Sequence, residues 1–429
     1  MHPERVALRT PERSLSYAQL LREALEVAAA VRDLGALDGR RRVALELAAG
    51  ADYVVALHAC MLAGVAVIPV DRRLSEDERA VRRARADLTI AEPLRRQSMS
   101  AATKPAEATR AFALAARLDD RSEPLAVMHT SGTTSAPKPV TLSHGNFLAS
   151  ALGSAVALGL DRDERWLCPM PLTHVGGFSI PIRSAIYATG VVLHGRFDTD
   201  AVLGELMDPA HGITLVSLVP TMLARLLDAG LANPATLRWA LLGGGPIAPA
   251  LVQRAEAAGV PVATTYGMTE ACSQIATFGY PLPGVDVSIA EGEILVRGPI
   301  VSRDTIASDG FLHSGDLGEL DDRVRLRIVG RRSDTIVSGG ENIAPAEVEA
   351  ALMEHPDVAD VGVHRRLDDE WGEIVVAKVV PRPGALVEPQ ALRDFCAQRI
   401  AHYKVPKSIE LVGELPRTRS GKLLRRELG

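Results

Sequence analysis

Segments with the periodicity of helices alternate with short apolar segments from the start of the chain to about residue 330. Leu15 to Leu34 has the apolar spacing of an amphipathic helix, and Ser16 stands where it can cap the first turn. Val191 to Leu193 and Thr214 to Val219 are short, mostly apolar segments, as in buried strands. Because parallel strands need crossover connections, which are usually helices, this alternation predicts a layered α/β region with mostly parallel sheets.

The alternation of helical and apolar segments gives way to a different pattern near residue 285, and a second, smaller set of helices and strands begins after residue 331. Residues 285–297 and 323–329 alternate apolar and polar side chains, which predicts antiparallel strands. Beyond Arg331 a smaller α+β unit is expected, joined to the large α/β domain by a hinge, so we predict domains at residues 1–332 and 333–429. The expected elements of the small domain are helices over Pro345–Met353 and Pro389–Ile400 and strands over Val358–His364 and Ile374–Val380.

Composition excludes several classes of protein. A net charge of −5 over 429 residues argues against a dedicated nucleic-acid surface. The four cysteines have no metal or redox spacing, which predicts buried thiols in a reducing compartment. The N-terminus is charged from Glu4 onward without an apolar signal segment, and the apolar run from Tyr53 to Val70 is broken by Gly64, as in a buried helix that leads into a strand. We therefore expect a cytoplasmic protein with no membrane insertion.

An apolar run from Leu125 opens into a loop crowded with hydroxyls and small residues that ends at Lys138. Small residues let backbone N–H groups converge on an anion, and hydroxyls and an ammonium add donors for phosphate oxygens. The loop does not match the Walker pattern, which needs Gly-x4-Gly-Lys-Ser/Thr. Taken alone, the segment is explained equally well as an ordinary turn.

Five further motifs follow along the chain, and together they favour the phosphate-binding interpretation over an ordinary turn. They are Thr265-Tyr-Gly-Met-Thr-Glu270, Ser314-Gly-Asp-Leu317, Gly330-Arg-Arg-Ser-Asp334, Gly339-Gly-Glu-Asn-Ile343 and Pro416-Arg-Thr-Arg-Ser-Gly-Lys-Leu423. In this order, and over nearly the whole chain, they resemble the adenylate-forming superfamily of acyl- and aryl-CoA ligases, firefly-type luciferases and peptide-synthetase adenylation domains. The resemblance implies a reaction in two halves: a carboxylate attacks the α-phosphate of ATP to give an acyl-adenylate and pyrophosphate, and a thiol, usually that of coenzyme A, then displaces AMP.

The resemblance also implies a role for each motif. Lys422 would bridge the carboxylate and the phosphate as a mobile point charge. Thr269 would bind the α-phosphate, and Glu270 would hold Mg²⁺, a hard cation that prefers oxygen ligands. The other expected residues are Thr130, Ser131, Gly132, Thr133, Thr134 and Lys138 for the β- and γ-phosphates, Gly243, Gly244, Gly245, Tyr266 and Gly267 for adenine, Asp316 and Arg331 for the ribose hydroxyls, Ser333 for the hinge, and Gly339 and Gly340 for the path of the thiol.

Each of these residues has an ordinary structural alternative: a solvated lysine near the C-terminus, an aromatic ring in the core, an ion pair at the surface. Two departures also stand in the phosphate loop, where Ser135 and Pro139 replace glycines that the family usually has. Serine adopts turn geometry at modest cost, whereas proline fixes φ and removes one N–H donor. We expect a stiffer loop or weaker phosphate binding.

The acid substrate is expected to be selected by the segment from Trp166 to Arg183. His174-Val-Gly-Gly, the arginine nine residues later and the segment around Ser217 resemble the o-succinylbenzoate–CoA ligases of menaquinone synthesis. That acid has two carboxylates, of which only the succinyl one is activated, so the aromatic one needs a partner within an apolar pocket. Arg183 fits this need because a buried guanidinium normally requires an anion. Ser217 could add a hydrogen bond, and His174 could gate the pocket or orient the thioester step.

Alternatives stay open. Arg183 could pair with a protein carboxylate, which would favour a CoA ligase for another aryl or aliphatic acid. Ser135 and Pro139 could mark a non-catalytic nucleotide-binding relative, although Lys422 and Glu270 argue against it. Relatives in the superfamily are often dimeric, which leaves a homodimer open.

Overall fold

The computed structural model describes residues 3–33, 41–94, 121–130, 138–418 and 423–429. Within these residues a nine-stranded sheet has the order β14-β13-β12-β11-β10-β8-β9-β1-β2, and a five-stranded sheet has the order β5-β3-β4-β6-β7. The strands of the first sheet are β1 (Val6–Arg9), β2 (Ser14–Ser16), β8 (Arg165–Cys168), β9 (Gly190–Leu193), β10 (Leu215–Leu218), β11 (Trp239–Leu242), β12 (Val262–Met268), β13 (Ser273–Thr277) and β14 (Tyr280–Pro281). Those of the second are β3 (Arg42–Leu45), β4 (Ala66–Pro69), β5 (Leu88–Ile90), β6 (Pro124–His129) and β7 (Pro139–Ser143).

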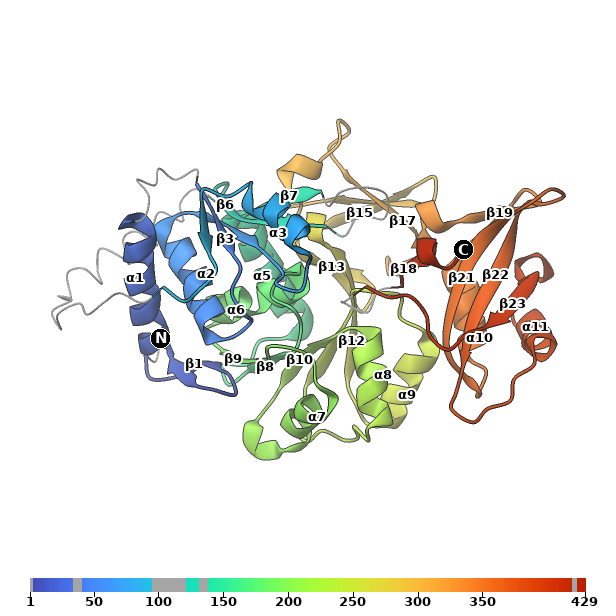
Figure 1. The fold of residues 1–429 in the computed structure, drawn as a ribbon, viewed down its shortest axis with the longest axis horizontal. Helices are drawn as coiled ribbons and strands as arrows, with labels where there is room; N and C mark the ends of the chain where they lie inside the picture. Colours follow the sequence, from blue (N-terminus) through green and yellow to red (C-terminus); the bar gives the residue numbers. More distant parts are fainter. Residues whose placement is uncertain (1–2, 34–40, 95–120, 131–137, 419–422) are drawn as a thin grey trace.

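Helices cover both sheets in layers (Figure 1). The helices of this region are α1 (Tyr17–Asp33), α2 (Ala51–Ala63), α3 (Glu76–Arg83), α5 (His144–Leu158), α6 (Val175–Tyr187), α7 (Thr199–Met207), α8 (Pro220–Asp228) and α9 (Pro249–Ala257). One core joins side chains of both sheets with those of α1, α2, α5 and α6, while a second core lies between the nine-stranded sheet and α7, α8 and α9. Along β8 the neighbours Trp166 and Leu167 belong to different cores, as the alternation of side chains across a strand requires.

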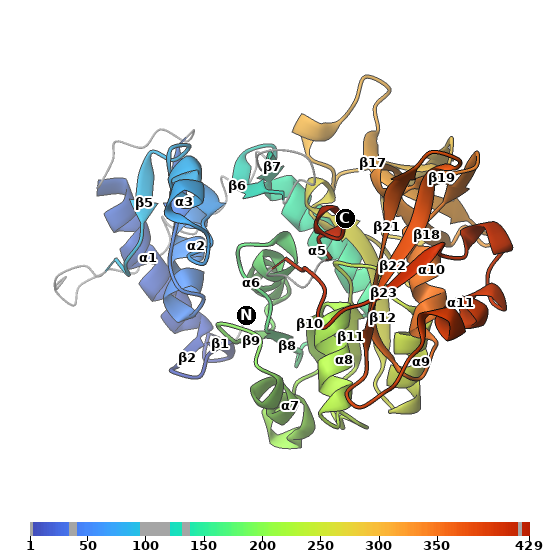
Figure 2. The same cartoon turned by 45° about the vertical axis from the view of Figure 1, so that its right-hand side comes forward.

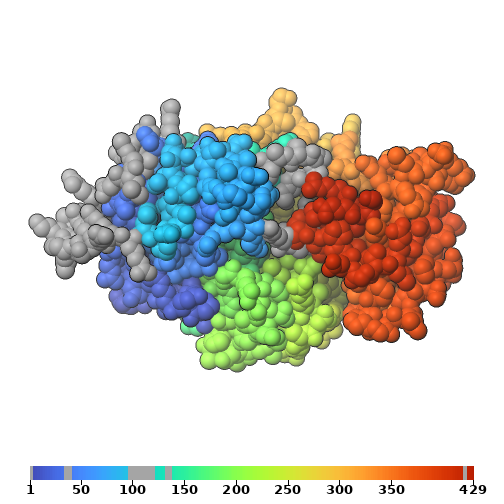
Figure 3. Space-filling view, in the orientation of Figure 1, coloured from blue at the N-terminus to red at the C-terminus, as the bar shows by residue number. Residues whose placement is uncertain are grey.

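Two smaller units follow along the chain (Figures 1 and 2). An antiparallel sheet contains β15 (Asp286–Ala290), β16 (Glu293–Arg297), β17 (Leu312–Leu320) and β18 (Leu326–Arg331) in that order. The C-terminal unit contains the strands β19 (Ile336–Ser338), β20 (Glu341–Ile343), β21 (Val358–Asp368), β22 (Gly372–Pro381) and β23 (Ser408–Leu411) with the helices α10 (Pro345–Met353) and α11 (Pro389–Ala397). It forms one end of the molecule (Figure 3), and its α10 contacts β18 and α9.

The predicted fold class is confirmed: the large region has mostly parallel sheets, and the C-terminal unit is α+β. Helix α10 has the predicted bounds, whereas α11 ends at Ala397, three residues before the predicted end. The first helix was predicted from Leu15 but begins at Tyr17, because residues 14–16 pair with β1 as an edge strand. Ser16 does cap it, since the Gln19 amide donates to its Oγ at 3.3 Å.

The run from Tyr53 to Val70 divides as predicted into α2 and β4, separated by Gly64 in the left-handed region at φ 73°. Among the described residues, none of the helices combines the length and apolar character that crossing a membrane requires. All four cysteines are free thiols in buried positions.

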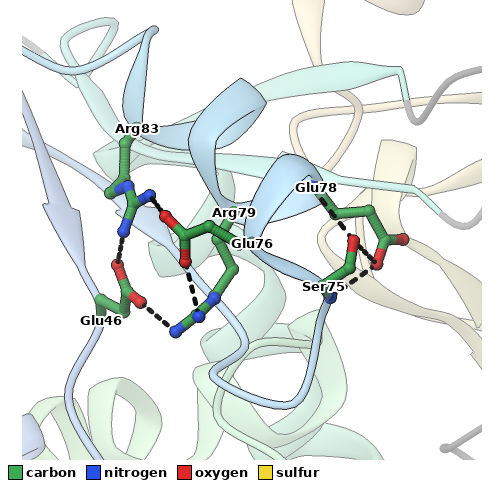
Figure 4. A network of polar contacts seen from close by, with 6 residues as sticks. All are labelled: Glu46, Ser75, Glu76, Glu78, Arg79 and Arg83. Carbon is green, nitrogen blue, oxygen red and sulfur yellow. Dashed lines mark hydrogen bonds and ion pairs between the residues drawn. The ribbon is translucent and has the colours of Figure 1, made fainter.

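A network of ion pairs fastens α3 to the five-stranded sheet (Figure 4). The Glu46 carboxylate, only 6% exposed, accepts from Arg79 at 2.7 Å and from Arg83 at 3.0 Å. Both arginines also contact the exposed Glu76. At the start of the helix, Ser75 and Glu78 form a reciprocal capping box. The network therefore fixes α3 against the end of β3.

The buried carboxylate of this network is expected to matter more than the exposed one. Glu46→Gln should lower the free energy of unfolding by about 1–3 kcal/mol, because charged hydrogen bonds are lost where water cannot replace them. Glu76→Gln removes contacts to the same two arginines at an exposed position and should change stability little. Urea unfolding of both variants measures the difference, and equal losses would contradict this account.

Candidate functional site

Three residues of the predicted nucleotide site lie in contact. The Tyr266 hydroxyl donates to Asp316 Oδ2 at 2.9 Å, and Arg331 Nε donates to Asp316 Oδ1 at 2.8 Å. Asp316 on β17 and Arg331 on β18 are opposite one another in the antiparallel register. Burial and the Asp316 charge both raise the pKa of Tyr266, so its hydroxyl stays a donor. The carboxylate keeps further lone pairs for other donors.

Glycines let the backbone approach this group closely. A Cβ on Gly243 would lie 2.7 Å from Thr265 Cγ2, and one on Gly267 would lie 1.5 Å from the Ser273 carbonyl oxygen. Gly244 has φ +79°, in the left-handed region, and Gly245 continues the turn after β11. The chain at Gly243 therefore fits against Thr265, and the chain at Gly267 fits against Ser273 of β13, only because neither glycine has a side chain.

Thr269 and Glu270 follow β12 in a short 3-10 turn, η3 (Thr269–Ala271). The Glu270 carbonyl accepts from the Ser302 amide at 2.8 Å, which fixes the backbone, and its carboxylate forms no ion pair with the described cations. The described part of the chain contains no group of three or more His, Cys, Asp or Glu side chains able to hold a metal ion. One carboxylate fits Mg²⁺, which typically takes one or two protein carboxylates together with substrate phosphates.

The phosphate loop is described only at its ends. The amide of Thr130 donates to the carbonyl of Lys138 at 3.0 Å, where β6 and β7 pair, and the Lys138 side chain is exposed. Ser131, Gly132, Thr133, Thr134 and Ser135 lie outside the described residues. Pro139 begins β7, at the edge of its sheet, where a missing N–H costs no ladder hydrogen bond.

His129, the last residue of β6, directly precedes this loop. Both of its ring nitrogens are buried, and neither has a hydrogen-bond partner among the described residues. Burial, followed by the charges of Arg82 and Arg85, lowers its pKa to about 4. The ring is therefore neutral at pH 7.

His174 stands at the N-terminus of α6 beside a charged pair that the sequence analysis did not identify. Arg73 binds the Asp71 carboxylate at 2.6 Å, and the Thr173 hydroxyl lies 3.5 Å from the same carboxylate. Burial lowers the pKa of His174, the Asp71 charge opposes that shift, and Arg73 adds to it. A signal existed in the sequence, since Asp71 comes two residues after the end of the buried strand β4, whose neighbours in the sheet are parallel.

Arg183, on α6, is only 2% exposed. Its Nη2 donates to Ser150 Oγ at 2.8 Å, and its guanidinium lies 5.9 Å from the ring centroid of Trp166. Its Nε has no hydrogen-bond partner among the described residues. Within the described residues it forms no salt bridge, so the alternative of a protein carboxylate partner is not observed. Burial lowers its pKa, although an arginine stays charged. Ser217 contacts Trp166, whose Nε1 donates to Ser217 Oγ at 3.0 Å.

Further residues with predicted roles belong to the C-terminal part of the chain. Ser333 lies in a 3-10 turn, η5 (Arg332–Asp334), between β18 and β19. Gly339 and Gly340 have φ of +58° and +86°, and the Gly339 amide donates to the Trp371 carbonyl at 2.9 Å. Lys422 lies outside the described residues.

The sequence matches known families over most of its length. Residues 1–304 match the family model of the AMP-binding enzymes, and residues 347–422 match that of the AMP-binding enzyme C-terminal domain. The chain therefore belongs to the family of AMP-binding enzymes.

Individual proteins and solved structures are similar to this chain over almost its full length. The 2-succinylbenzoate–CoA ligase of Bacillus licheniformis is 37% identical to this chain, over 99% of the chain and 97% of the relative. The o-succinylbenzoate CoA synthetase of Bacillus subtilis, solved with its acyl-adenylate intermediate, is 34% identical with a TM-score of 0.86, over 100% of this chain and 96% of that one. The same enzyme solved with ATP and a magnesium ion has a TM-score of 0.85, over 100% and 97% of the two chains, at 34% identity.

Asp316 is expected to support ATP binding. Asp316→Asn should raise the KM for ATP at least about tenfold, because a charged acceptor that faces Tyr266 and Arg331 is lost. Asp286→Asn is a matched control, since Asp286 pairs with Arg297 across the exposed edge of the same sheet. Pyrophosphate release measured against ATP concentration tests this, and an unchanged KM in Asp316→Asn would contradict the assignment.

His129 is expected to make stability depend on pH. Its folded pKa of about 4 lies below its ordinary value near 6.5, so the unfolded chain takes up a proton first as the pH falls. Stability present above pH 6.5 is therefore lost as the pH falls toward 4. His129→Phe should flatten this dependence, and urea unfolding at pH 7, 6 and 5 measures it. Parallel curves for the two proteins would exclude this role.

Proposed function

We propose that this chain is an ATP-dependent 2-succinylbenzoate–CoA ligase, which forms 2-succinylbenzoyl-AMP and then the CoA thioester. The observation that carries the choice of acid is Arg183, a buried guanidinium without a carboxylate partner among the described residues. A buried charge without a partner is costly, so its retention points to an anion that arrives with the substrate. Relatives of this name that match over almost the full length support the same reaction.

An acid with two carboxylates would use both the nucleotide-binding residues and Arg183. One carboxylate is activated at the α-phosphate, close to Thr269, while the other meets Arg183 on α6. An aryl acid with a single carboxylate would leave Arg183 unpaired in the complex. Trp166 offers an aromatic face beside that guanidinium, and Ser217 holds its indole N–H. Burial lowers the pKa of His174, so the ring is neutral at pH 7, and we assign it to gating the acyl pocket or orienting the thioester step.

In the adenylation half, the enzyme brings two anions together and stabilises the charge that develops at phosphorus. Residues 130–134 with Lys138 bind the β- and γ-phosphates, and Lys422 bridges the carboxylate and the α-phosphate. Glu270 would hold Mg²⁺, which neutralises phosphate charge when bound. Tyr266 stacks on adenine while Asp316 and Arg331 bind the ribose hydroxyls.

In the thioester half, the C-terminal domain, residues 333–429, rotates about Ser333. This rotation withdraws Lys422 and brings Gly339 and Gly340 toward the thiol of coenzyme A. The backbone at both glycines already has positive φ, which a loop that approaches a ligand closely can use. We place the reaction in the cytoplasm, where the four free thiols stay reduced.

The acid specificity gives the test. The wild type should prefer 2-succinylbenzoate over 4-oxo-4-phenylbutyrate, which lacks the aromatic carboxylate, in pyrophosphate release with ATP, Mg²⁺ and coenzyme A. Arg183→Gln should lower kcat/KM for 2-succinylbenzoate about a hundredfold and leave the monocarboxylate nearly unchanged, because only the charged hydrogen bond is lost.

The melting temperature of Arg183→Gln is the control, because it shows whether the variant still folds. Because Arg183 forms no observed ion pair, Arg183→Gln should melt no lower than the wild type. Turnover only with monocarboxylates would keep the class of ligase but discard this substrate. Intact ATP binding without turnover of any acid would favour a non-catalytic relative and implicate Ser135 and Pro139.

A further inference from the structure

Ser150, in the middle of α5, contacts both Arg183 and Cys272, which follows the motif from Thr265 to Glu270. Its side chain is buried, at 1% exposure. Its Oγ accepts from Arg183 Nη2 at 2.8 Å and donates to the Cys272 carbonyl oxygen at 2.7 Å. One hydroxyl thus connects α5, α6 and the residue directly after η3.

The direction of this hydroxyl is fixed from both sides. Cys272 ends η3 in the left-handed region, with φ 50°, which sets the direction of its carbonyl. Guanidinium groups only donate, so the single Ser150 proton must go to Cys272, and a lone pair must face Arg183. The short serine side chain has few rotamers, so it holds one N–H of Arg183 at little cost in entropy.

We propose that Ser150 is a positioning residue for Arg183 and thereby determines specificity for an acid with a second carboxylate. This inference rests on the proposed function, since it concerns how Arg183 meets the substrate. With Nη2 held by Ser150, the guanidinium cannot rotate freely, and its Nε, which no described residue binds, keeps a fixed direction. A neutral partner also leaves the positive charge available, which a carboxylate at position 150 would cancel.

The chain offers a matched control on the same helix. Ser154 lies one turn further along α5 and is buried to the same 1%, but among the described residues no hydrogen bond joins its Oγ to Arg183. Ser150→Ala and Ser154→Ala therefore remove the same atom at the same depth. Only the first removes a contact to Arg183.

The experiment compares kcat and KM for 2-succinylbenzoate and 4-oxo-4-phenylbutyrate in the full-length enzyme. Ser150→Ala should lower kcat/KM for the dicarboxylate about tenfold, mainly through KM, and change that for the monocarboxylate less than about twofold. Ser154→Ala should leave both acids unchanged. An equal loss for the two acids would show a merely structural role for Ser150, and no loss for either would also overturn the proposal.

A second comparison tests whether Ser150 acts through Arg183. In an Arg183→Gln background, the further change Ser150→Ala should have no additional effect on the dicarboxylate, since the group that it positions is gone. An additional tenfold loss there would overturn the inference. Failure of the wild type to prefer 2-succinylbenzoate would instead overturn the proposed function, so the two failures are distinguishable.

Discussion

The parallel register of four neighbouring strands is the constraint on which the candidate site depends. Leu215 is paired with both Trp166 and Trp239, and Ala240 is paired with Val262, so β8, β10, β11 and β12 are aligned side by side. Aligned parallel strands end at the same edge of a sheet, and ligands of open α/β sheets bind outside that edge. Because of this register, the glycines after β11 and the motif at the end of β12 lie at the same edge of the sheet. The residues of either motif alone do not predict this.

The fold was predictable wherever local periodicity decides it. The bounds of α10 and the division of the run from Tyr53 to Val70 follow from spacing, glycine and proline alone. Strand β2 was not predictable, because residues 14–16 have the composition of a helix start and become a strand only by pairing with β1. The end of α11 was also missed, since its last turn stops before the apolar pattern does.

The sequence predicts which residues make up the candidate site, and these assignments stay predictions, but it does not predict the contacts that the structure shows among them. The Asp316–Arg331 pair follows from motifs on consecutive strands of a hairpin, and Tyr266 joins it from a separate sheet. Ser150 was not foreseen because it lies in a helix rich in small residues, where a serine carries no distinctive signal. Only the tertiary packing of α5 against α6 shows that this hydroxyl faces a guanidinium.

Glu46 and Arg183 are both buried charges, but only Glu46 has oppositely charged partners among the described residues. Glu46 is satisfied by Arg79 and Arg83, as expected of a charge whose purpose is to hold an element in place. Arg183 is more deeply buried than either arginine, yet the described residues supply it with a serine hydroxyl and an aromatic face and no carboxylate. Selection for stability alone would remove such a charge or pair it. Because Arg183 has no carboxylate partner among the described residues and Ser150 holds one of its N–H groups, we propose that its anion arrives with the substrate, so that the arrangement provides specificity at a cost in stability.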